Sequence, residues 1–334
     1  MARREITEPT VLATPNGDLA PDAGGWSRKP LHTSDNIPHG LYYLWRTKKW
    51  DYWGITTPEL VLGLTVADLD YANFVQVYLY DRSTKETIAE EHAPLLNGRG
   101  VELPTSLPPL KVYGSSNGIT LDFEEVDTSR TIIRVKSPRV TAELTVDTSG
   151  ESLSVAVPWG KARYFYTVKA PSLPVTGTVT IDGSRTHTVG QDAFAVLDRG
   201  RGRWNYRNVW NWAAAGGVNP DGQRIGFTLG ANAKPNGDTE NALVVDKVLD
   251  FGHPQIKWEY NIDKPEEPWT LKADWIEATV TPWHVRKASI NRLLVASSTI
   301  QVFGDWSGWA RLKDGTRVSL DGLTGFAEEA WQRY

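Results

Sequence analysis

Short runs of alternating apolar and polar residues, separated by turn dipeptides, dominate this sequence and limit the folds open to it. Successive side chains of a β-strand point to opposite faces, so this alternation is typical of strands with one buried face. Apolar positions at the helical spacing of three and four residues are scarce. The clearest strand candidates are 60–66, 74–80, 131–135, 142–146 and 175–181. The sequence therefore predicts an all-β protein.

Turn signals support this interpretation. Aspartate or asparagine followed by glycine accepts the positive φ values that two-residue hairpin turns need. Such dipeptides are Asp182-Gly183, Asp221-Gly222, Asn236-Gly237 and Asp314-Gly315. The end of the chain differs, because residues 326–331 predict a short C-terminal helix with Phe326 and Ala330 on one side.

The length of 334 residues exceeds what one hydrophobic core usually organises, so two β domains are expected. Residues 1–40 are rich in proline, glycine and aspartate and predict an extended N-terminal arm. Pro171 and Pro174 interrupt the strand pattern and fit a domain change near 163–170.

Composition argues against several classes of function. A formal net charge of −4 disfavours a nucleic-acid partner, and no apolar run approaches the roughly 20 residues of a membrane span. Arg3 and Arg4 are not followed by the apolar stretch of a secretory signal, so we expect a cytoplasmic protein. The absence of cysteine excludes disulfides and thiolate sites. Without a phosphate-loop or zinc-protease motif, we expect no cofactor and no metal, and the oligomeric state stays open.

The most unusual segment is 198–204, which places one aspartate, three arginines, two glycines and a tryptophan side by side. The chain has 15 tryptophans in all, and two more follow at 210 and 212. If residues 204–212 form one extended strand, alternate side chains make an aromatic face from Trp204, Tyr206, Asn208, Trp210 and Trp212. That face is either core between two sheets or a wall that stacks on a ligand or stabilises a cation.

Asp198 follows the apolar run 193–197, so it is expected at the end of a buried strand. Burial favours the protonated acid, whereas nearby Arg199 and Arg201 favour the anion. A salt-bridged Asp198 would be structural or a base. It would be a general acid only if the arginines point away.

Other candidates also have two interpretations. Glu240 and Asn241 either brace a turn or supply a second carboxylate that works with Asp198. His284, beside a tryptophan, is either a packing residue or a ligand contact. Lys169, which ends an aromatic run, is either a solvated strand end or a substrate contact.

The sequence resembles a bacterial family known as domain of unknown function 2804 along nearly its whole length. The matching motifs are Lys49-Trp50-Asp51-Tyr52-Trp53-Gly54, Tyr166-Thr167-Val168-Lys169, Leu197-Asp198-Arg199-Gly200-Arg201-Gly202, Trp210-Asn211-Trp212, Thr239-Glu240-Asn241-Ala242 and Gly325-Phe326-Ala327-Glu328-Glu329. It is similar, more distantly, to the carotenoid hydratase and AttH-like group. The motifs there are Tyr52-Trp53, Phe165-Tyr166, Val175-Thr176-Gly177-Thr178, Asp198 before the Trp-rich strand, Asp221-Gly222 and Trp306-Ser307-Gly308.

The second resemblance implies two lipocalin-like β domains, 41–163 and 164–334, that enclose an apolar cavity. It also implies cofactor-independent hydratase, isomerase or cyclase chemistry on an unsaturated lipid, with Asp198 as the proton donor. Two residues before the aspartate, that group has an aromatic residue, whereas this chain has Val196. The arginine run also departs from its pattern, which suggests a substrate with a carboxylate or phosphate end.

Three functions follow. The first is a cofactor-independent lyase, isomerase or cyclase with Asp198 and Glu240 as catalytic residues. Its substrate would contact Arg199, Arg201, Trp204, Tyr206, Trp210, Trp212, Asn241, Lys169, His284 and Trp53. The second is a non-catalytic carrier of an apolar or amphipathic small molecule. The third is a carbohydrate-active enzyme with Asp198 and Glu240 as paired carboxylates.

Overall fold

The computed structural model describes residues 4–43, 45–95, 100–231, 239–291 and 295–333. Over these ranges the chain is all-β, as predicted, and η1 (Leu41–Tyr43) is the one short 3-10 helix. The chain divides into two compact units, Met1–Trp204 and Asn205–Tyr334. The domain boundary expected at residue 164 coincides with the first residue of strand β14 (Tyr164–Ile181), which lies inside the first unit.

The first unit contains one large, mainly antiparallel sheet. Its main path runs β7-β6-β5-β4-β16-β14-β12-β11-β10-β9-β8, while β13 and β15 pair with β14, and β2 pairs with β13. The strands are β2 (Gly25–Ser27), β4 (Thr47–Thr56), β5 (Leu60–Asp68), β6 (Asn73–Asp81), β7 (Thr87–His92), β8 (Val101–Glu102), β9 (Lys111–Ser116), β10 (Ile119–Asp127), β11 (Arg130–Lys136), β12 (Val140–Asp147), β13 (Leu153–Pro158), β14 (Tyr164–Ile181), β15 (Arg185–Val189) and β16 (Phe194–Arg203). A separate pair, β1 (Thr10–Val11) and β3 (His32–Thr33), lies in the N-terminal segment.

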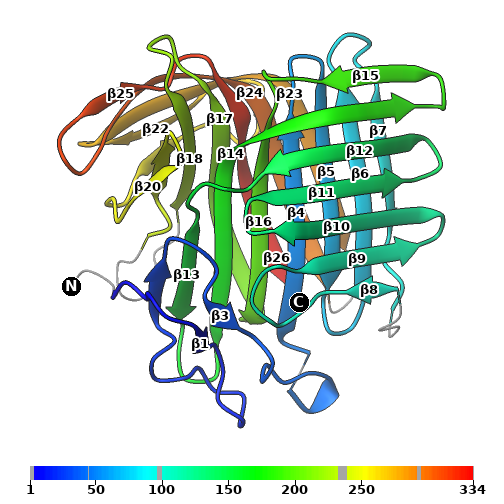
Figure 1. The fold of residues 1–334 in the computed structure, drawn as a ribbon, viewed down its shortest axis with the longest axis vertical. Coiled ribbons are helices and arrows are strands. Elements are labelled where there is room, and N and C mark those ends of the chain that lie inside the picture. The colour runs from blue at the N-terminus through cyan, green and yellow to red at the C-terminus, as the bar shows by residue number, and fades with distance from the viewer. Residues whose placement is uncertain (1–3, 44, 96–99, 232–238, 292–294, 334) are drawn as a thin grey trace. The chain divides into compact units, whose positions relative to one another are not determined.

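Strand β14 links two halves of this sheet. Its first half pairs with β13 and β16, and its second half pairs with β12 and β15. The register shifts between Ala170 and Leu173, where Ser172 has a φ of 59°. The sheet can therefore fold over on itself, so that strands β8–β12 cross β4–β7 (Figure 1).

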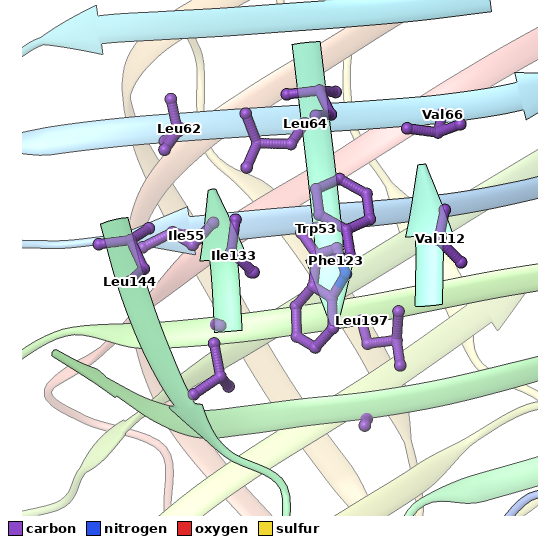
Figure 2. Close-up of a cluster of buried hydrophobic side chains, with 14 of the residues drawn as sticks. Trp53, Ile55, Leu62, Leu64, Val66, Val112, Phe123, Ile133, Leu144 and Leu197 are labelled. Atoms are coloured by element: carbon purple, nitrogen blue, oxygen red, sulfur yellow. The ribbon is translucent and has the colours of Figure 1, made fainter. Parts of the chain in front are cut away.

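The core of the first unit lies between these two halves. Figure 2 shows Trp53 and Leu64 on one side facing Phe123 and Ile133 on the other. The rings of Trp53 and Phe123 meet edge to face with centroids 6.3 Å apart. On β9, a Cβ at Gly114 would lie 2.8 Å from a Val66 methyl, so the close approach of the halves requires glycine there.

The second unit is a sheet of its own with the order β20-β19-β18-β17-β26-β24-β23-β22-β21, with β25 on β24. Its strands are β17 (Arg207–Val218), β18 (Arg224–Ala231), β19 (Ala242–Val245), β20 (Val248–Phe251), β21 (Lys257–Glu259), β22 (Trp269–Ala273), β23 (Ile276–Asn291), β24 (Ala296–Arg311), β25 (Arg317–Ser319) and β26 (Leu323–Arg333). Its core contains Phe227 and Trp306, whose ring centroids are 4.8 Å apart, and the fully buried Trp269.

The predicted C-terminal helix is wrong, because this segment forms strand β26. It lies between β17 and β24 and pairs with both along nearly its whole length. Ala327 points into the core while Phe326 lies on the other face against Trp212, as the period of two requires. Pairing on both sides therefore overrides the helix propensity of Ala327-Glu328-Glu329-Ala330.

The turn predictions fare better. Asp182 and Gly183 have φ values of 51° and 65° between β14 and β15, and Gly222 and Gly315 also have positive φ. The predicted turn at 236–237 lies outside the described residues. No helix within the described ranges is long and apolar enough to cross a membrane.

Candidate functional site

Strand β16 lies in the middle of the first unit's sheet, between β4 and β14, and every one of its residues is buried. Asp198 is opposite Tyr52 on β4 and Lys169 on β14. Directly paired residues of neighbouring strands share a face, and successive residues alternate. The strand therefore has a core face, with Leu197, Arg199 and Arg201, and an opposite face, which we call the Asp198 face.

The Asp198 carboxylate accepts hydrogen bonds from three side chains. Oδ1 lies 2.9 Å from Lys169 Nζ and accepts a hydrogen bond from Thr167 Oγ1 at 3.0 Å. Oδ2 accepts one from Trp50 Nε1 at 3.2 Å. The indole and the ammonium group can only donate, so both carboxylate oxygens act as acceptors. The result is a buried, oriented ion pair in which Asp198 is 7% exposed.

A group of aromatic rings begins at Trp50, which contacts this carboxylate, and continues toward the end of β16. The Trp50 ring lies across Gly200, where an added Cβ would come within 2.1 Å of it, so only glycine leaves room for the indole. Trp204 is 5.3 Å from Trp50, 5.3 Å from Phe165 and 5.0 Å from Trp159, measured between ring centroids. We call Trp50, Trp159, Phe165 and Trp204 the aromatic cluster.

The core face of β16 carries a different set of charges. Arg199 Nε donates to Asp51 Oδ2 at 2.9 Å, and its Nη2 reaches Glu125 Oε1 at 2.8 Å. Arg201 Nη2 donates to Asp51 Oδ1 at 2.9 Å, and its Nη1 donates to the carbonyls of Trp50 and Gly200. Asp51 therefore bridges two arginines.

The two arginines respond differently to burial. Burial alone would lower the pKa of Arg199, but the charges of Asp51 and Glu125 outweigh it and raise that pKa. Burial lowers the pKa of Arg201, and the positive charge of Arg199 adds to this effect. The negative charge of Asp51 opposes both but does not outweigh them. Both guanidinium groups are already bound by protein acceptors. These contacts do not test the predicted role of the two arginines in holding a substrate anion.

Three residues of this arrangement were not among the predicted site residues: Asp51, Thr167 and Trp50. They lie 31 to 148 positions away from Asp198 or its arginine neighbours in the chain. One signal was available, since Asp51 stands among the aromatic residues Trp50, Tyr52 and Trp53. Trp53 itself lies in the core and is 1% exposed.

The predicted single strand from 204 to 212 is wrong, since the chain passes there from one sheet to the other. Trp204 belongs to the first unit, and Tyr206, 39% exposed, precedes β17. Trp210 and Trp212 do share a face of β17, as the alternation predicts. Their indole groups donate to Glu328 Oε1 at 3.1 Å and Thr228 Oγ1 at 3.0 Å.

The remaining predicted residues also lie in the second unit. Asn241 is fully buried, accepts a hydrogen bond from the Gly230 amide and donates one to the Pro254 carbonyl. These contacts agree with the interpretation of Asn241 as a residue that braces a turn. Glu240 precedes β19 and is half-buried. The His284 ring stacks on Phe303 at 6.1 Å. Of the predicted polar site residues, Asp198 and Lys169 are in direct contact, at 2.9 Å.

The sequence matches a family described as "Domain of unknown function (DUF2804)" over residues 3–334. The chain belongs to this family. A comparison with curated proteins gives no match. The fold is that of lipocalin-like two-domain proteins, and solved structures similar to this DUF2804 member share it at low sequence identity.

Three of these structures cover most of the chain. An AttH-like protein of Nitrosomonas europaea aligns with 85% of this chain and 92% of its own, at 13% identity and a TM-score of 0.54. Kievitone hydratase of Nectria haematococca aligns with 92% of this chain and 96% of its own, at 15% identity and a TM-score of 0.50. CghA aligns with 86% of this chain and 88% of its own, at 11% identity and a TM-score of 0.51.

Proposed function

We propose that this protein catalyses a cofactor-independent proton-transfer reaction on an unsaturated, largely apolar small molecule. Hydration or dehydration, double-bond isomerisation and cyclisation are the reaction types of this class. The observation that carries the proposal is the Asp198–Lys169 pair, with Nζ and Oδ1 2.9 Å apart and the Trp50 indole bonded to Asp198 Oδ2. A buried acid–base pair next to aromatic faces supplies what protonation of a double bond needs.

In the hydration direction, the Lys169 ammonium transfers a proton to one alkene carbon. Asp198 takes a proton from the water whose oxygen bonds to the other carbon. The proton then passes from Asp198 to the Lys169 amine across the 2.9 Å contact, which restores both groups. In the reverse direction Asp198 gives its proton to the departing hydroxyl. The resemblance to carotenoid hydratases implies a different assignment, in which Asp198 protonates the alkene itself. Isomerisation uses the same two groups, with one carbon gaining and another losing a proton.

The aromatic cluster has a role in the same scheme. Protonating an alkene leaves positive charge on carbon, and tryptophan faces attract a cation by about 0.5–2 kcal/mol each. Trp50 adds a second function, because its indole fixes Asp198 Oδ2 while its ring lies across Gly200. Kievitone hydratase, a solved structure with the same fold, is named for a hydratase activity, which supports this reaction class.

Native mass spectrometry of the protein purified from its own source organism, followed by solvent extraction, tests the proposal. The comparison is between wild type, Asp198→Asn and Asp192→Asn. Asp192 is an exposed aspartate that precedes β16 and is outside the site. We expect wild type and Asp192→Asn to carry the same molecule. Asp198→Asn should carry a related one that differs by water or by a double-bond position.

Two outcomes would overturn the proposal. If all three proteins carry the same apolar molecule, the protein is a carrier and Asp198 has no catalytic role. If the bound molecule is a glycan, the apolar-substrate proposal is wrong and a carbohydrate-active function replaces it.

A further inference from the structure

Arg203, the last residue of β16, differs from the other two arginines of the strand. It lies on the same face as Arg199 and Arg201 but is opposite Tyr164 and Thr47 rather than an acid. The residue is 7% exposed. Among the described residues its Nε has no hydrogen-bond partner, and its guanidinium makes no ion pair. Its side-chain hydrogen bond is a long one, from Nη1 to the Gly17 carbonyl at 3.4 Å.

A buried guanidinium in this state is unfavourable unless something else compensates its charge. The Tyr43 ring, 5.4 Å from Arg203 Cζ, provides part of that compensation through its π face. A cation at this depth normally has a carboxylate or phosphate partner with two parallel hydrogen bonds. Arg199 and Arg201 share the carboxylate of Asp51 as their partner, and Arg203 has no carboxylate partner among the described residues.

Two further arginines lie at the same end of the sheet. Arg46 immediately precedes β4, and its carbonyl accepts a hydrogen bond from the Trp204 amide at 2.7 Å. Arg163 immediately precedes β14 and makes no ion pair within the described ranges. Burial, together with the charges of Arg203 and Arg46, lowers the pKa of Arg163. Positive charge therefore accumulates here.

Two acids near this end, Asp18 and Asp70, are already engaged. Asp18 pairs with Lys161 at 3.2 Å. Asp70 accepts a hydrogen bond from the Gly40 amide at 2.7 Å and lies 3.7 Å from His39 Nδ1. Neither acid forms an ion pair with Arg203 or Arg163, so the positive charge of this end is not balanced by them.

We propose that Arg203 binds one small oxyanion, the carboxylate or phosphate group of a ligand, at this end of the first unit, and that the positive charge of Arg163 adds to the attraction. The planar guanidinium fork suits either group. The near-complete burial of Arg203 restricts contact to a single small oxyanion group. Arg203 is five residues from Asp198, roughly 16 Å along an extended strand, and on the opposite face. The site is thus separate from the acid–base pair and does not depend on the proposed reaction.

Isothermal titration calorimetry with inorganic phosphate and with acetate, against chloride at equal ionic strength, tests this site. The proteins are wild type, Arg203→Lys, Arg163→Gln and Arg130→Gln. Arg203→Lys keeps the charge but loses the fork, and Arg163 is partly exposed, so its variant is expected to fold. Arg130 is an exposed arginine on β11 and serves as the matched control.

We expect wild type and Arg130→Gln to bind phosphate or acetate equally. Arg203→Lys and Arg163→Gln should bind at least about tenfold more weakly. Binding of phosphate alone assigns a phosphate ligand, and binding of acetate alone assigns a carboxylate. The proposal is overturned if wild type binds neither anion up to about 10 mM, or if Arg163→Gln and Arg203→Lys both bind as wild type does.

Discussion

The two faces of β16 use similar residues in opposite ways. On the core face, Asp51 and Glu125 bind Arg199 and Arg201, so the charges of acids and arginines largely cancel within the protein. On the Asp198 face, one carboxylate is held by a lysine, a hydroxyl and the indole of Trp50. The first arrangement is a network of ion pairs within the protein. The second combines a proton acceptor with a proton donor.

The neighbouring strands create this difference. Strand β4 places Asp51 on the core face and Trp50 on the Asp198 face, one residue apart. Strand β14 contributes Thr167 and Lys169 to the Asp198 face alone. The chemistry of an acid in β16 therefore depends on which partners the register provides, and less on its neighbours in the sequence.

The largest expected effect comes from breaking the core-face network. Asp51→Ala leaves two buried guanidinium groups without their shared acid, which should lower the free energy of unfolding by roughly 3–5 kcal/mol. Urea denaturation measures it. The control is Glu124→Gln, which removes an acid paired on the surface of β10 and should change stability little. Equal stability losses in the two variants would contradict a structural role for the core-face network.

The next effect concerns the space that Gly200 leaves for Trp50. Gly200→Ala would place a methyl group 2.1 Å from the indole, so the ring must move and give up its hydrogen bond to Asp198. Overpacking of this kind costs about 1–3 kcal/mol of unfolding free energy. Tryptophan fluorescence and urea denaturation would report both changes. Gly190→Ala, with open space at its Cβ, is the matched control. An unchanged spectrum in Gly200→Ala would contradict the packing described for Trp50.

A pH effect is expected from Lys48, which lies opposite Gly202 on the Asp198 face. Burial lowers the pKa of Lys48 from 10.5 to about 7, with Asp70 opposing and Arg46 adding to the shift. Between these two pH values the unfolded chain binds more protons than the folded one. The contribution of Lys48 to the free energy of unfolding therefore rises with pH, by up to about 1.4 kcal/mol per unit.

Urea denaturation at about pH 7, 8 and 9 measures this slope. The difference between wild type and Lys48→Met isolates it, because other groups titrate in both proteins. The exposed Lys136→Met should keep the wild-type slope. A flat difference between wild type and Lys48→Met would show that Lys48 keeps its proton when buried.

The smallest expected effect is at Thr167. Thr167→Val removes one hydrogen bond to Asp198 Oδ1 and keeps the side-chain shape, which should cost about 0.5–1.5 kcal/mol of unfolding free energy. Thr176→Val, at an exposed position of the same strand, should change stability little. If both substitutions have the same effect, the Thr167 hydroxyl does not stabilise the carboxylate.

Much of the fold could be predicted from the sequence, because alternation and Asp-Gly turns are local signals. The error at 326–331 shows the limit, since the pairing of β26 with two strands depends on residues far away in the chain. The site was predictable in part. Asp198 and Lys169 were both singled out, but their contact depends on the register of β14 against β16. Trp50 and Asp51 could not be assigned to opposite faces of the site without the pairing of β4 to β16.

The central claim, that Asp198 and Lys169 move protons on an unsaturated molecule, can be tested most directly by isotope exchange. An apolar extract of the source organism is incubated with the protein in D2O and analysed by mass spectrometry. Wild type and Asp192→Asn should introduce carbon-bound deuterium into one component, and Asp198→Asn should not. Absence of exchange with wild type, or equal exchange with Asp198→Asn, would contradict the claim.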